Sequence, residues 1–379
     1  MKIGIDCRIF SSSFTGIGRY TYELVKNIIQ FNENSRHKNE IVLFFNDPEY
    51  ASFDPQSSHV KKIRVNAKHY SLSEQIRFLK KLNKENCDIV HFPHFNIPIL
   101  YRRPYTVTIH DLTLSLFPGQ KMNKWYHRLA YHFTIKNATK KAKAVIAVSN
   151  NTKQDIIDHL GTPEEKIITI YNGVGKEFTL LKDPKETHPT LKKYGISKQF
   201  LLYTGVWRNH KNLPRLIQAF SLLKERGLPL SLVITGKPDP HYPEVKNTVK
   251  SLKLEDDVIF PGLVDEKELI HLYNAAFIYV FPSLYEGFGL PPLESMRCGT
   301  PVVASKTSSI PEVCGEDNAL FFHPENVEEI ADKVEMLYKD PQLQVKLIEQ
   351  GARHSAKFSW EEMAEKTYQI ICSNHSKNS

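Results

Sequence analysis

The chain has 379 residues, and single hydrophobic cores usually stop growing below that length, so two domains are expected rather than one. Hydrophobic residues make up 41% of the chain and charged residues 24%, which is ordinary for a soluble globular protein. The sequence contains no run of about 18 apolar residues, and Asp6 and Arg8 interrupt the apolar N-terminus, so neither a membrane span nor a signal peptide is expected. Five scattered cysteines, odd in number and never spaced as C-x-x-C, indicate neither a disulfide framework nor a zinc site, and a cytoplasmic protein is predicted.

Positive charge is concentrated in the first half of the chain. Residues 1–180 contain 26 Lys and Arg against 16 Asp and Glu, whereas the remaining residues contain 24 against 26. Residues 112–154 hold eight Lys and Arg and no acidic residue. In one interpretation this segment is a binding surface for anionic lipid headgroups or an anionic acceptor. In the other it forms a solvated helix face with its aromatic residues in the core. Both interpretations stay open. Its aromatic residues include Trp125, Tyr126, Tyr131 and Phe133.

Short runs rich in β-branched residues alternate with helical patterns along the first half. This alternation predicts a parallel sheet with crossover helices. A helix over 150–160 has Ser149 as its expected N-cap and Gly161 at its end. The predicted strands are 2–6, 40–45, 61–66, 88–92, 105–111, 144–149 and 166–171, and the other predicted helices are 18–30 and 73–86.

A polar segment broken by Gly and Pro, 172–195, is interpreted as a linker, after which the alternation restarts. The pattern predicts an α/β fold of two tandem Rossmann-like, doubly wound domains with a cleft between them. In the second half the predicted strands are 200–205, 230–236, 257–262, 277–283 and 301–305, and the predicted helices are 211–226, 242–254, 265–276 and 291–299.

The stretch FPSLYEGFGLPPLES places Glu286 and Glu294 around a loop that joins a predicted strand to a helix. Backbone amides at such a helix start can hold a phosphate, and the two carboxylates can accept hydrogen bonds from hydroxyl groups. A polyol joined to a phosphate fits this arrangement. Alternatively, Glu294 only complements the helix dipole and Glu286 is solvated. The amides concerned are those of Phe288, Gly289 and Leu290.

EGFGLPPLE, continued by GTPVVAS and SSIPEVCG, closely resembles the E-x7-E signature of the family 4 retaining nucleotide-sugar glycosyltransferases, which have the GT-B fold. The resemblance covers nearly the whole chain, including TGIGRYTYELVKNI, YTVTIHDL and YTGVWRNHKNLPRLIQAF. It is strongest to bacterial enzymes of surface polysaccharide synthesis (O-antigen, lipopolysaccharide and capsule), often mannosyltransferases that use GDP-mannose. The resemblance implies an acceptor-binding domain at 1–180, a donor-binding domain at 195–358, and a C-terminal helix at 359–379 that returns to the first domain.

The resemblance also implies roles for residues of the second domain. Glu294 would accept hydrogen bonds from the ribose hydroxyls, and Glu286 with the amides that follow it would hold the donor sugar. Lys211, expected to open a helix, would bind the diphosphate and neutralise the charge that grows on the leaving group. Family members often have an arginine directly after the strand glycine, but here Val206 follows Gly205. The residues that would supply the second positive charge are Arg208 or His210.

Further site residues are implied on both domains. Gly16 and Gly18 are expected in a tight loop before a helix, where the backbone can approach the donor phosphate. His110 ends a predicted strand and would lie in the catalytic centre, although a structural role is the alternative; Asp111 would orient it or cap the next turn. The candidates for backbone contact with the nucleobase are Gly262, Leu263 and Val264.

The implied reaction is transfer of a hexose, mannose from GDP-mannose, to a hydroxyl of a glycan or lipid-linked glycan with retention at the anomeric carbon. The chain lacks a D-x-D motif, so no metal is expected, and no cofactor beyond the nucleotide-sugar donor. The acceptor is expected to dock at 121–133 and 70–76. The enzyme would work in the cytoplasm at the inner face of the cytoplasmic membrane, which its basic first half would contact.

Other interpretations stay open or are disfavoured. The same reaction with a UDP- or dTDP-sugar, a nucleotide-sugar epimerase, and a non-catalytic GT-B scaffold protein remain alternatives, the last because Val206 departs from the family pattern. An NAD-dependent dehydrogenase needs G-x-G-x-x-G, and TGIGRY lacks the third glycine. A nucleic-acid binder would share the basic character, but no binding motif accompanies the charge.

Overall fold

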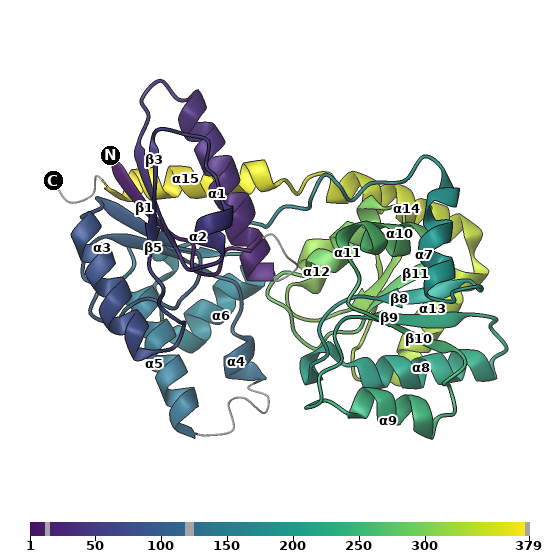
Figure 1. Cartoon of the computed structure of the whole chain (residues 1–379). Coiled ribbons are helices and arrows are strands. Elements are labelled where there is room, and N and C mark those ends of the chain that lie inside the picture. Colours follow the sequence, from purple (N-terminus) through teal and green to yellow (C-terminus); the bar gives the residue numbers. More distant parts are fainter. Residues whose placement is uncertain (12–15, 118–124, 376–379) are drawn as a thin grey trace. The chain divides into compact units, whose positions relative to one another are not determined.

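The computed structural model describes residues 1–11, 16–117 and 125–375. These residues form two compact units (Figure 1). Within the described part, the first unit comprises residues 1–115, 125–173 and 359–375, and the second comprises 116–117 and 174–358. The chain passes from one unit to the other at 173–174, close to the start of the predicted linker, and its last helix belongs to the first unit.

The first unit is built on a seven-stranded parallel sheet with the order β3-β2-β1-β4-β5-β6-β7. All seven predicted strands are present. Most of their residues are buried, which explains why they read as continuous apolar runs rather than as alternating ones. The strands are β1 Lys2–Asp6, β2 Glu40–Phe45, β3 Val60–Arg64, β4 Ile89–Phe92, β5 Tyr105–Ile109, β6 Ala144–Ala147 and β7 Ile167–Thr169.

Helices join the strands of this sheet, as the parallel arrangement requires. The predicted N-cap of α6 is confirmed, because the Ser149 hydroxyl accepts a hydrogen bond from the Thr152 amide at 3.0 Å, and Gly161 ends the helix in the left-handed conformation. The C-terminal helix α15 packs along α1 (Figure 1). The helices are α1 Gly16–Asn34, α2 Glu49–Ser52, a π-helical turn Glu74–Phe78, α3 Leu79–Glu85, α4 Thr113–Leu116, α5 Trp125–Lys141, α6 Asn150–Leu160 and α15 Trp360–His375.

The second unit contains a six-stranded parallel sheet with the order β10-β9-β8-β11-β12-β13. The five predicted strands are confirmed. The sixth, β13, is missing from the prediction. The strands are β8 Phe200–Tyr203, β9 Ser231–Thr235, β10 Val258–Gly262, β11 Ile278–Phe281, β12 Val302–Ser305 and β13 Leu320–Phe322.

The helices of the second unit include four predicted ones and four others. The segment 172–195, interpreted as a linker, contains α7, so that interpretation is wrong for its second half. No helix in the described ranges is both long and apolar enough to cross a membrane. The helices are α7 His188–Lys193, α8 Leu213–Glu225, α9 Glu244–Ser251, α10 Glu266–Ala275, α11 Leu290–Arg297, α12 Ile310–Cys314, α13 Val327–Lys339 and α14 Pro341–Ser355.

Each sheet has one point at which the strand order reverses direction. In the first sheet this switch point lies between β1 and β4, and in the second it lies between β8 and β11. Loops that leave neighbouring strands at a switch point diverge, and ligands bind in the crevice that they leave at the carboxyl edge. The topology alone therefore gives each unit one preferred position for a ligand.

Candidate functional site

The loops that follow β8 and β11 lie on the two sides of the switch point of the second sheet. Lys211 comes from the loop after β8, and Glu286 comes from the loop after β11. The Lys211 Nζ atom lies 2.6 Å from the Glu286 Oε1 atom. Each side chain is only about one-seventh exposed, at 15% and 14%. The structure thus joins two predicted site residues that are 75 positions apart, at the place where a doubly wound sheet binds its ligand.

The position of Lys211 differs from the sequence prediction. Instead of opening a helix, it is the last residue of a 3-10 turn, Asn209–Lys211, and α8 begins two residues later. Asn212 adopts a positive φ of 59° between the two elements, so the chain turns sharply there. Its amide group donates to the Pro282 carbonyl oxygen at 3.0 Å. Asn212 therefore fixes the loop after β8 to the loop after β11, and this fixes Lys211 beside Glu286.

Two serines hold the backbone around Glu286. The Glu286 amide donates to the Ser308 hydroxyl at 3.0 Å. The Ser309 hydroxyl lies 2.9 Å from the carbonyl oxygens of both Glu286 and Phe288. Both serines belong to the segment SSIPEVCG, which the sequence analysis matched to the family signature. Its structural role was not predicted. The turn acts as a clamp on the loop that carries Glu286.

Glu294 is the fifth residue of α11, one position further into the helix than in the predicted range 291–299, and is 8% exposed. The Tyr273 hydroxyl donates to its Oε2 atom at 2.9 Å. The same hydroxyl lies 2.9 Å from the Thr204 Oγ1 atom, which in turn lies 3.1 Å from the Tyr279 hydroxyl. Sequence reasoning missed these three residues, because nothing in their local pattern marks them as partners of a carboxylate.

The hydrogen bond from Tyr273 to Glu294 leads to a prediction. We expect Tyr273→Phe to weaken nucleotide binding about fivefold, because a hydrogen bond to a buried group contributes about 1 kcal/mol and the carboxylate loses a donor that orients it. Calorimetric titration with the nucleotide measures this effect. Tyr338→Phe, on α13 of the same unit, serves as the control, and equal affinities in the two variants would contradict the role of Tyr273.

The start of α11 limits which amides could hold a phosphate. Gly289 precedes the helix with a φ of 99°, a conformation that favours glycine. Pro291 and Pro292 follow Leu290, and proline has no amide hydrogen. Donors for a phosphate must therefore come from Leu290 and from the loop before it, which includes Phe288.

The loop after β8 carries the departure from the family pattern. Gly205 has a φ of 143°, and Val206, which takes the place of the usual arginine, is 53% exposed. Of the two residues predicted to replace that charge, His210 is 8% exposed, whereas Arg208 is exposed. Within the described part of the chain, the Arg208 guanidinium makes no hydrogen bond or ion pair. Arg208 is therefore the more accessible of the two side chains.

The predicted nucleobase contacts lie at the end of β10, on the same carboxyl edge and two strands away from β8. Gly262 has a φ of 79°, and its carbonyl oxygen accepts a hydrogen bond from the Gly236 amide at 2.8 Å. Leu263 is 72% exposed, and Val264 is partly exposed. The segment thus presents an apolar side chain and backbone groups at the edge where a base would lie.

In the first unit, the two predicted glycines are not in a loop. Gly16 is the first and Gly18 the third residue of α1, and the helix continues to Asn34. The prediction of a tight loop is wrong because the helical pattern that follows extends through both glycines; residues 12–15 lie outside the described residues. The first amides of a helix still lack intrahelical partners and carry partial positive charge, so the position remains suited to a phosphate.

His110 follows β5 and is held by the loop after β4. Its Nε2 atom lies 2.8 Å from the Pro93 carbonyl oxygen, so this nitrogen carries the hydrogen. Burial lowers the pKa of His110, which favours the neutral ring at pH 7. The Nδ1 atom is then a hydrogen-bond acceptor. The Asp111 carboxylate accepts from the Thr113 amide at 2.8 Å and thus caps the following turn, one of its two expected roles.

The basic segment of the first unit exposes most of its aromatic residues. On α5, Trp125, Tyr126 and Phe133 are 71%, 46% and 59% exposed, whereas Tyr131 is buried. Leu129 is also exposed, at 58%, and lies four residues from both Trp125 and Phe133 on the same helix face. The interpretation that the aromatic residues of this segment lie in the core is therefore wrong for three of these four aromatic residues and holds only for Tyr131. Residues 121–124 of the expected acceptor region lie outside the described residues.

Among the described residues, no group of three or more His, Cys, Asp or Glu side chains is placed to hold a metal ion. The positive group next to the Glu286 carboxylate is the Lys211 ammonium group, from the loop after β8.

Comparison with known proteins gives consistent results over both halves. The family model Glycosyltransferase Family 4 matches residues 14–178, and the model Glycosyl transferases group 1 matches residues 188–354. O-antigen chain mannosyltransferase B of Escherichia coli is 30% identical over 387 aligned positions, which cover 97% of this chain and 98% of that protein. O-antigen chain mannosyltransferase RfbU of Salmonella typhimurium is 30% identical over 275 positions, covering 70% and 71%.

Among solved structures, the Anabaena protein HepE in complex with UDP and glucose has a TM-score of 0.76 and 19% identity, and the match covers 98% of this chain and 100% of that one. The two doubly wound parallel sheets therefore define a protein of the GT-B fold class, as predicted. The chain belongs to glycosyltransferase family 4, and it is a glycosyltransferase.

Proposed function

We propose that the protein transfers mannose from GDP-mannose to a hydroxyl group of a glycan or lipid-linked glycan during synthesis of a surface polysaccharide, with retention at the anomeric carbon and without a metal ion. The observation that carries the donor site is the pairing of Lys211 with Glu286 at the switch point, with Glu294 buried on the helix that follows. The names of the Escherichia coli and Salmonella relatives support mannose and the polysaccharide.

The chemistry follows from the charges in this site. As the bond between the sugar C1 and the phosphate oxygen breaks, negative charge grows on the diphosphate, and a fixed cation lowers the free energy of that transition state. Lys211 supplies this cation, and its ion pair with Glu286 holds the ammonium group in place before the donor arrives. Arg208 supplies the second positive charge in place of the missing arginine at Val206.

The acceptor hydroxyl attacks C1 on the face from which the phosphate leaves. Its oxygen forms the new bond to C1, and its proton passes to a departing phosphate oxygen, so no protein base is required. His110 takes part as a hydrogen-bond acceptor for a sugar hydroxyl, because its Nε2–H is held by the Pro93 carbonyl and its Nδ1 atom carries the lone pair. Gly16 and Gly18 contribute the start of α1 as a further site for the diphosphate.

A UDP-sugar donor is the second candidate. It is favoured by the similarity to Anabaena HepE, whose structure contains UDP and glucose. Base contacts through backbone groups, such as those expected from Gly262 and Val264, do not reveal which base is bound.

A donor panel tests the function. The purified protein is incubated with GDP-mannose, UDP-glucose, UDP-galactose and dTDP-rhamnose, with octyl α-mannoside as the probe acceptor and EDTA present. We expect mannose transfer and slow hydrolysis from GDP-mannose only, and an NMR spectrum of the product that shows an α-linkage. Consumption of another donor would replace mannose in the proposal, and failure to consume any donor would favour the scaffold alternative.

We also propose that the protein works at the cytoplasmic face of an anionic membrane, which it contacts through α5. The exposed face of this helix carries Trp125, Leu129 and Phe133 together with Arg128 and, among its described residues, no acidic group. Aromatic residues next to basic ones suit the headgroup region of a bilayer, where the rings enter the interface and the cations meet lipid phosphates. A lipid-linked acceptor is reached most directly from this position.

Vesicle sedimentation tests this contact. We expect the wild-type protein to sediment with phosphatidylglycerol vesicles at low salt and less at high salt, because salt screens the charges. The Trp125→Ser and Phe133→Ser double variant is expected to lose most of this binding, whereas Leu180→Ser, which removes a 64%-exposed leucine from the second unit, is expected to keep it. Equal sedimentation of both variants would contradict the role of α5.

A further inference from the structure

A row of buried polar side chains in the first unit ends at His110, and the proposed chemistry uses only that last member. Thr106, Thr108 and His110 alternate along β5 and the residue after it, so they point to one side of the sheet. The His91 Nδ1 atom lies 2.9 Å from the Thr106 Oγ1 atom, and its Nε2 atom lies 3.4 Å from the Thr108 Oγ1 atom. The Tyr20 hydroxyl lies 3.0 Å from the same Thr108 oxygen. These contacts join Tyr20 to the strand that carries His110.

Burial of this polar row needs a physical explanation. Tyr20 is 1% exposed, and Thr106, Thr108 and His91 are fully buried. Burial lowers the pKa of His91 to about 3, and the nearby His110 lowers it further, so the His91 ring is neutral at pH 7. A satisfied buried network contributes little net stability relative to apolar residues, but it fixes one arrangement of its side chains. The arrangement that this row fixes is the one around His110.

The Tyr20 ring contacts the imidazole ring of His110. The two ring centroids lie 4.7 Å apart and the ring planes are inclined by 84°, so the edge of one ring faces the plane of the other. Such T-shaped pairs are favourable beyond the apolar area that they bury. Tyr20 lies in the second turn of α1, whereas His110 follows β5. A residue of another element therefore packs directly on the histidine that is proposed to meet the sugar.

The hydrogen bond to Pro93 does not by itself set the orientation of the His110 ring. It fixes the position of the Nε2 atom, but the χ2 torsion of histidine is soft, and a carbonyl oxygen accepts over a broad range of directions. The ring can still turn about that bond. Contact with the Tyr20 ring restricts this turning and thereby fixes the direction of the Nδ1 lone pair. A hydrogen bond from a sugar hydroxyl depends on that direction.

The C-terminal helix α15 also supports Tyr20. This helix packs along α1 and against β4 and β5. Burial raises the pKa of Tyr20 to about 12, and hydroxyl contacts with Thr108 and with Thr367 of α15 oppose that rise. The Tyr20 hydroxyl therefore keeps its proton at pH 7 and joins β5 to α15. Trp360, the first residue of α15, is a further ring neighbour, with 6.5 Å between the centroids.

We propose that Tyr20 is a positioning residue for His110. Its ring sets the plane of the imidazole, and its hydroxyl, held by Thr108 and by Thr367 of α15, keeps that ring in place. The inference rests on the proposed function, in which His110 accepts a hydrogen bond from a sugar hydroxyl. It also gives the C-terminal helix a part in the reaction, because α15 supports the residue that orients His110.

A double-mutant cycle between Tyr20 and His110 tests the inference. Initial rates of transfer from GDP-mannose to octyl α-mannoside are measured for Tyr20→Leu, His110→Ala and the double variant. We expect Tyr20→Leu to lower kcat about fivefold, because the aromatic pair is lost, and to have no further effect once His110 is replaced. Tyr20→Phe keeps the ring but loses its anchor, and its kcat should lie between those of the wild type and Tyr20→Leu.

Tyr101→Leu is the matched control. Tyr101 is also 1% exposed in the first unit, but it packs against the rings of Phe92 and Tyr105. Its replacement should lower the temperature of thermal unfolding as Tyr20→Leu does, and should leave kcat unchanged. Effects of Tyr20→Leu and His110→Ala that multiply in the double variant would indicate a purely structural role for Tyr20 and would overturn the inference.

NMR of protein labelled with 15N-histidine gives a readout that needs no activity. The His110 ring signals are identified by their absence from His110→Ala. We expect a single Nε2–H tautomer in the wild type and broadened signals in Tyr20→Leu, or in Tyr20→Met if the leucine variant does not fold. Unchanged His110 signals would overturn the inference.

The same variants separate this inference from the proposed function. If His110→Ala leaves kcat unchanged, the proposed role of His110 fails, and the positioning role of Tyr20 fails with it. If His110→Ala lowers kcat and Tyr20→Leu does not, only the role of Tyr20 is overturned. Titration of each variant with GDP shows whether the donor site of the second unit is intact.

Discussion

Replacement of Lys211 with alanine is expected to lower kcat for sugar transfer by about 100- to 1000-fold, the range found when one fixed group that stabilises transition-state charge is removed. The ammonium group is held 2.6 Å from Glu286 at the switch point, so its position is set before the donor binds. Its charge matters most when the diphosphate departs, and the acceptor KM should change little. Initial rates at varied donor and acceptor concentrations separate these parameters.

Two controls make the Lys211 result specific. Lys250→Ala removes an exposed lysine from α9 of the same unit and should leave kcat unchanged. Loss of Lys211 also leaves Glu286, whose side chain is only 14% exposed, without its ion-pair partner, which could destabilise the fold. Thermal unfolding of Lys211→Ala and Lys211→Gln must therefore be compared with that of the wild type. A fall in kcat of less than tenfold in a folded variant would remove Lys211 from the catalytic centre.

Substitution of Glu294 with glutamine should raise the Kd for the nucleotide about 10- to 100-fold, since hydrogen bonds to a charged group contribute about 1.5–3 kcal/mol. Glutamine keeps the shape and one carbonyl oxygen but removes the charge. The carboxylate is 8% exposed and is oriented by Tyr273, so little of its effect is lost to solvent. Calorimetric titration measures the change directly.

Glu328→Gln, at an exposed position on α13, is the matched control and should bind nucleotide like the wild type. If Glu294→Gln also binds the nucleotide as tightly as the wild type, the Glu294 carboxylate does not contact the nucleotide and only complements the dipole of α11. The ratio of the two affinities decides between these roles.

The sequence predicted those elements whose signal is local. Short apolar or β-branched runs marked all the strands except β13, and Ser149 with Gly161 marked both ends of α6. Local patterns were less reliable at helix starts. Gly16 and Gly18 lie in the first turn of α1 rather than in a loop, and Lys211 ends a 3-10 turn rather than opening α8. A loop, a 3-10 turn and the first turn of an α-helix can have similar sequences, so the local pattern does not distinguish them.

The long-range contacts of the site could not be read from the sequence. Family resemblance supplied Lys211 and Glu286 as separate residues, and only the pairing of β8 with β11 brings them together. The Tyr273 hydroxyl reaches Glu294 across 21 positions and Thr204 across 69. Such contacts depend on which strands become neighbours, and no periodicity within one segment encodes that choice.

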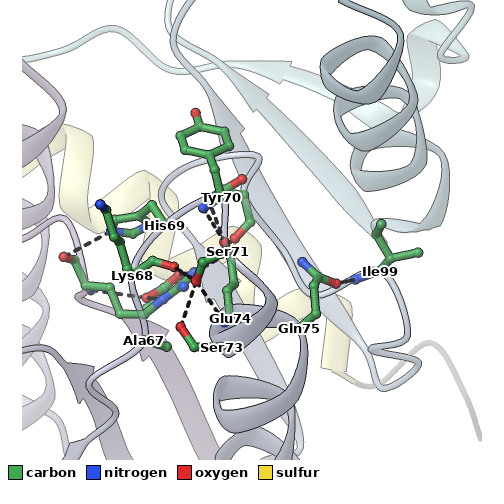
Figure 2. Close-up of polar contacts among 12 residues, drawn as sticks. Ala67, Lys68, His69, Tyr70, Ser71, Ser73, Glu74, Gln75 and Ile99 are labelled. Carbon is green, nitrogen blue, oxygen red and sulfur yellow. Dashed lines mark hydrogen bonds and ion pairs between the residues drawn. The ribbon is translucent and has the colours of Figure 1, made fainter. Parts of the chain in front are cut away.

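The first unit shows the same limit. The apolar run of β1 predicted a strand, but the contact of Arg8 with Glu74 spans 66 positions and depends on the loop after β3. From the sequence, Asp6 and Arg8 were recognised only as charged residues that interrupt the apolar N-terminus, and their contacts were not predicted. The strained backbone of Tyr70, whose amide donates to the Glu74 Oε2 atom at 2.7 Å (Figure 2), has no sequence signal, since tyrosine is not a residue expected at positive φ.

The most direct test of the proposed donor site is calorimetric titration of the wild-type protein, Lys211→Ala and Glu294→Gln with GDP, UDP, ADP and dTDP in EDTA. The proposal predicts that GDP binds the wild type more tightly than the other three nucleotides do, and that both substitutions weaken it. Absence of binding by all four nucleotides, or binding that neither substitution affects, would contradict the placement of the donor at the switch point between β8 and β11.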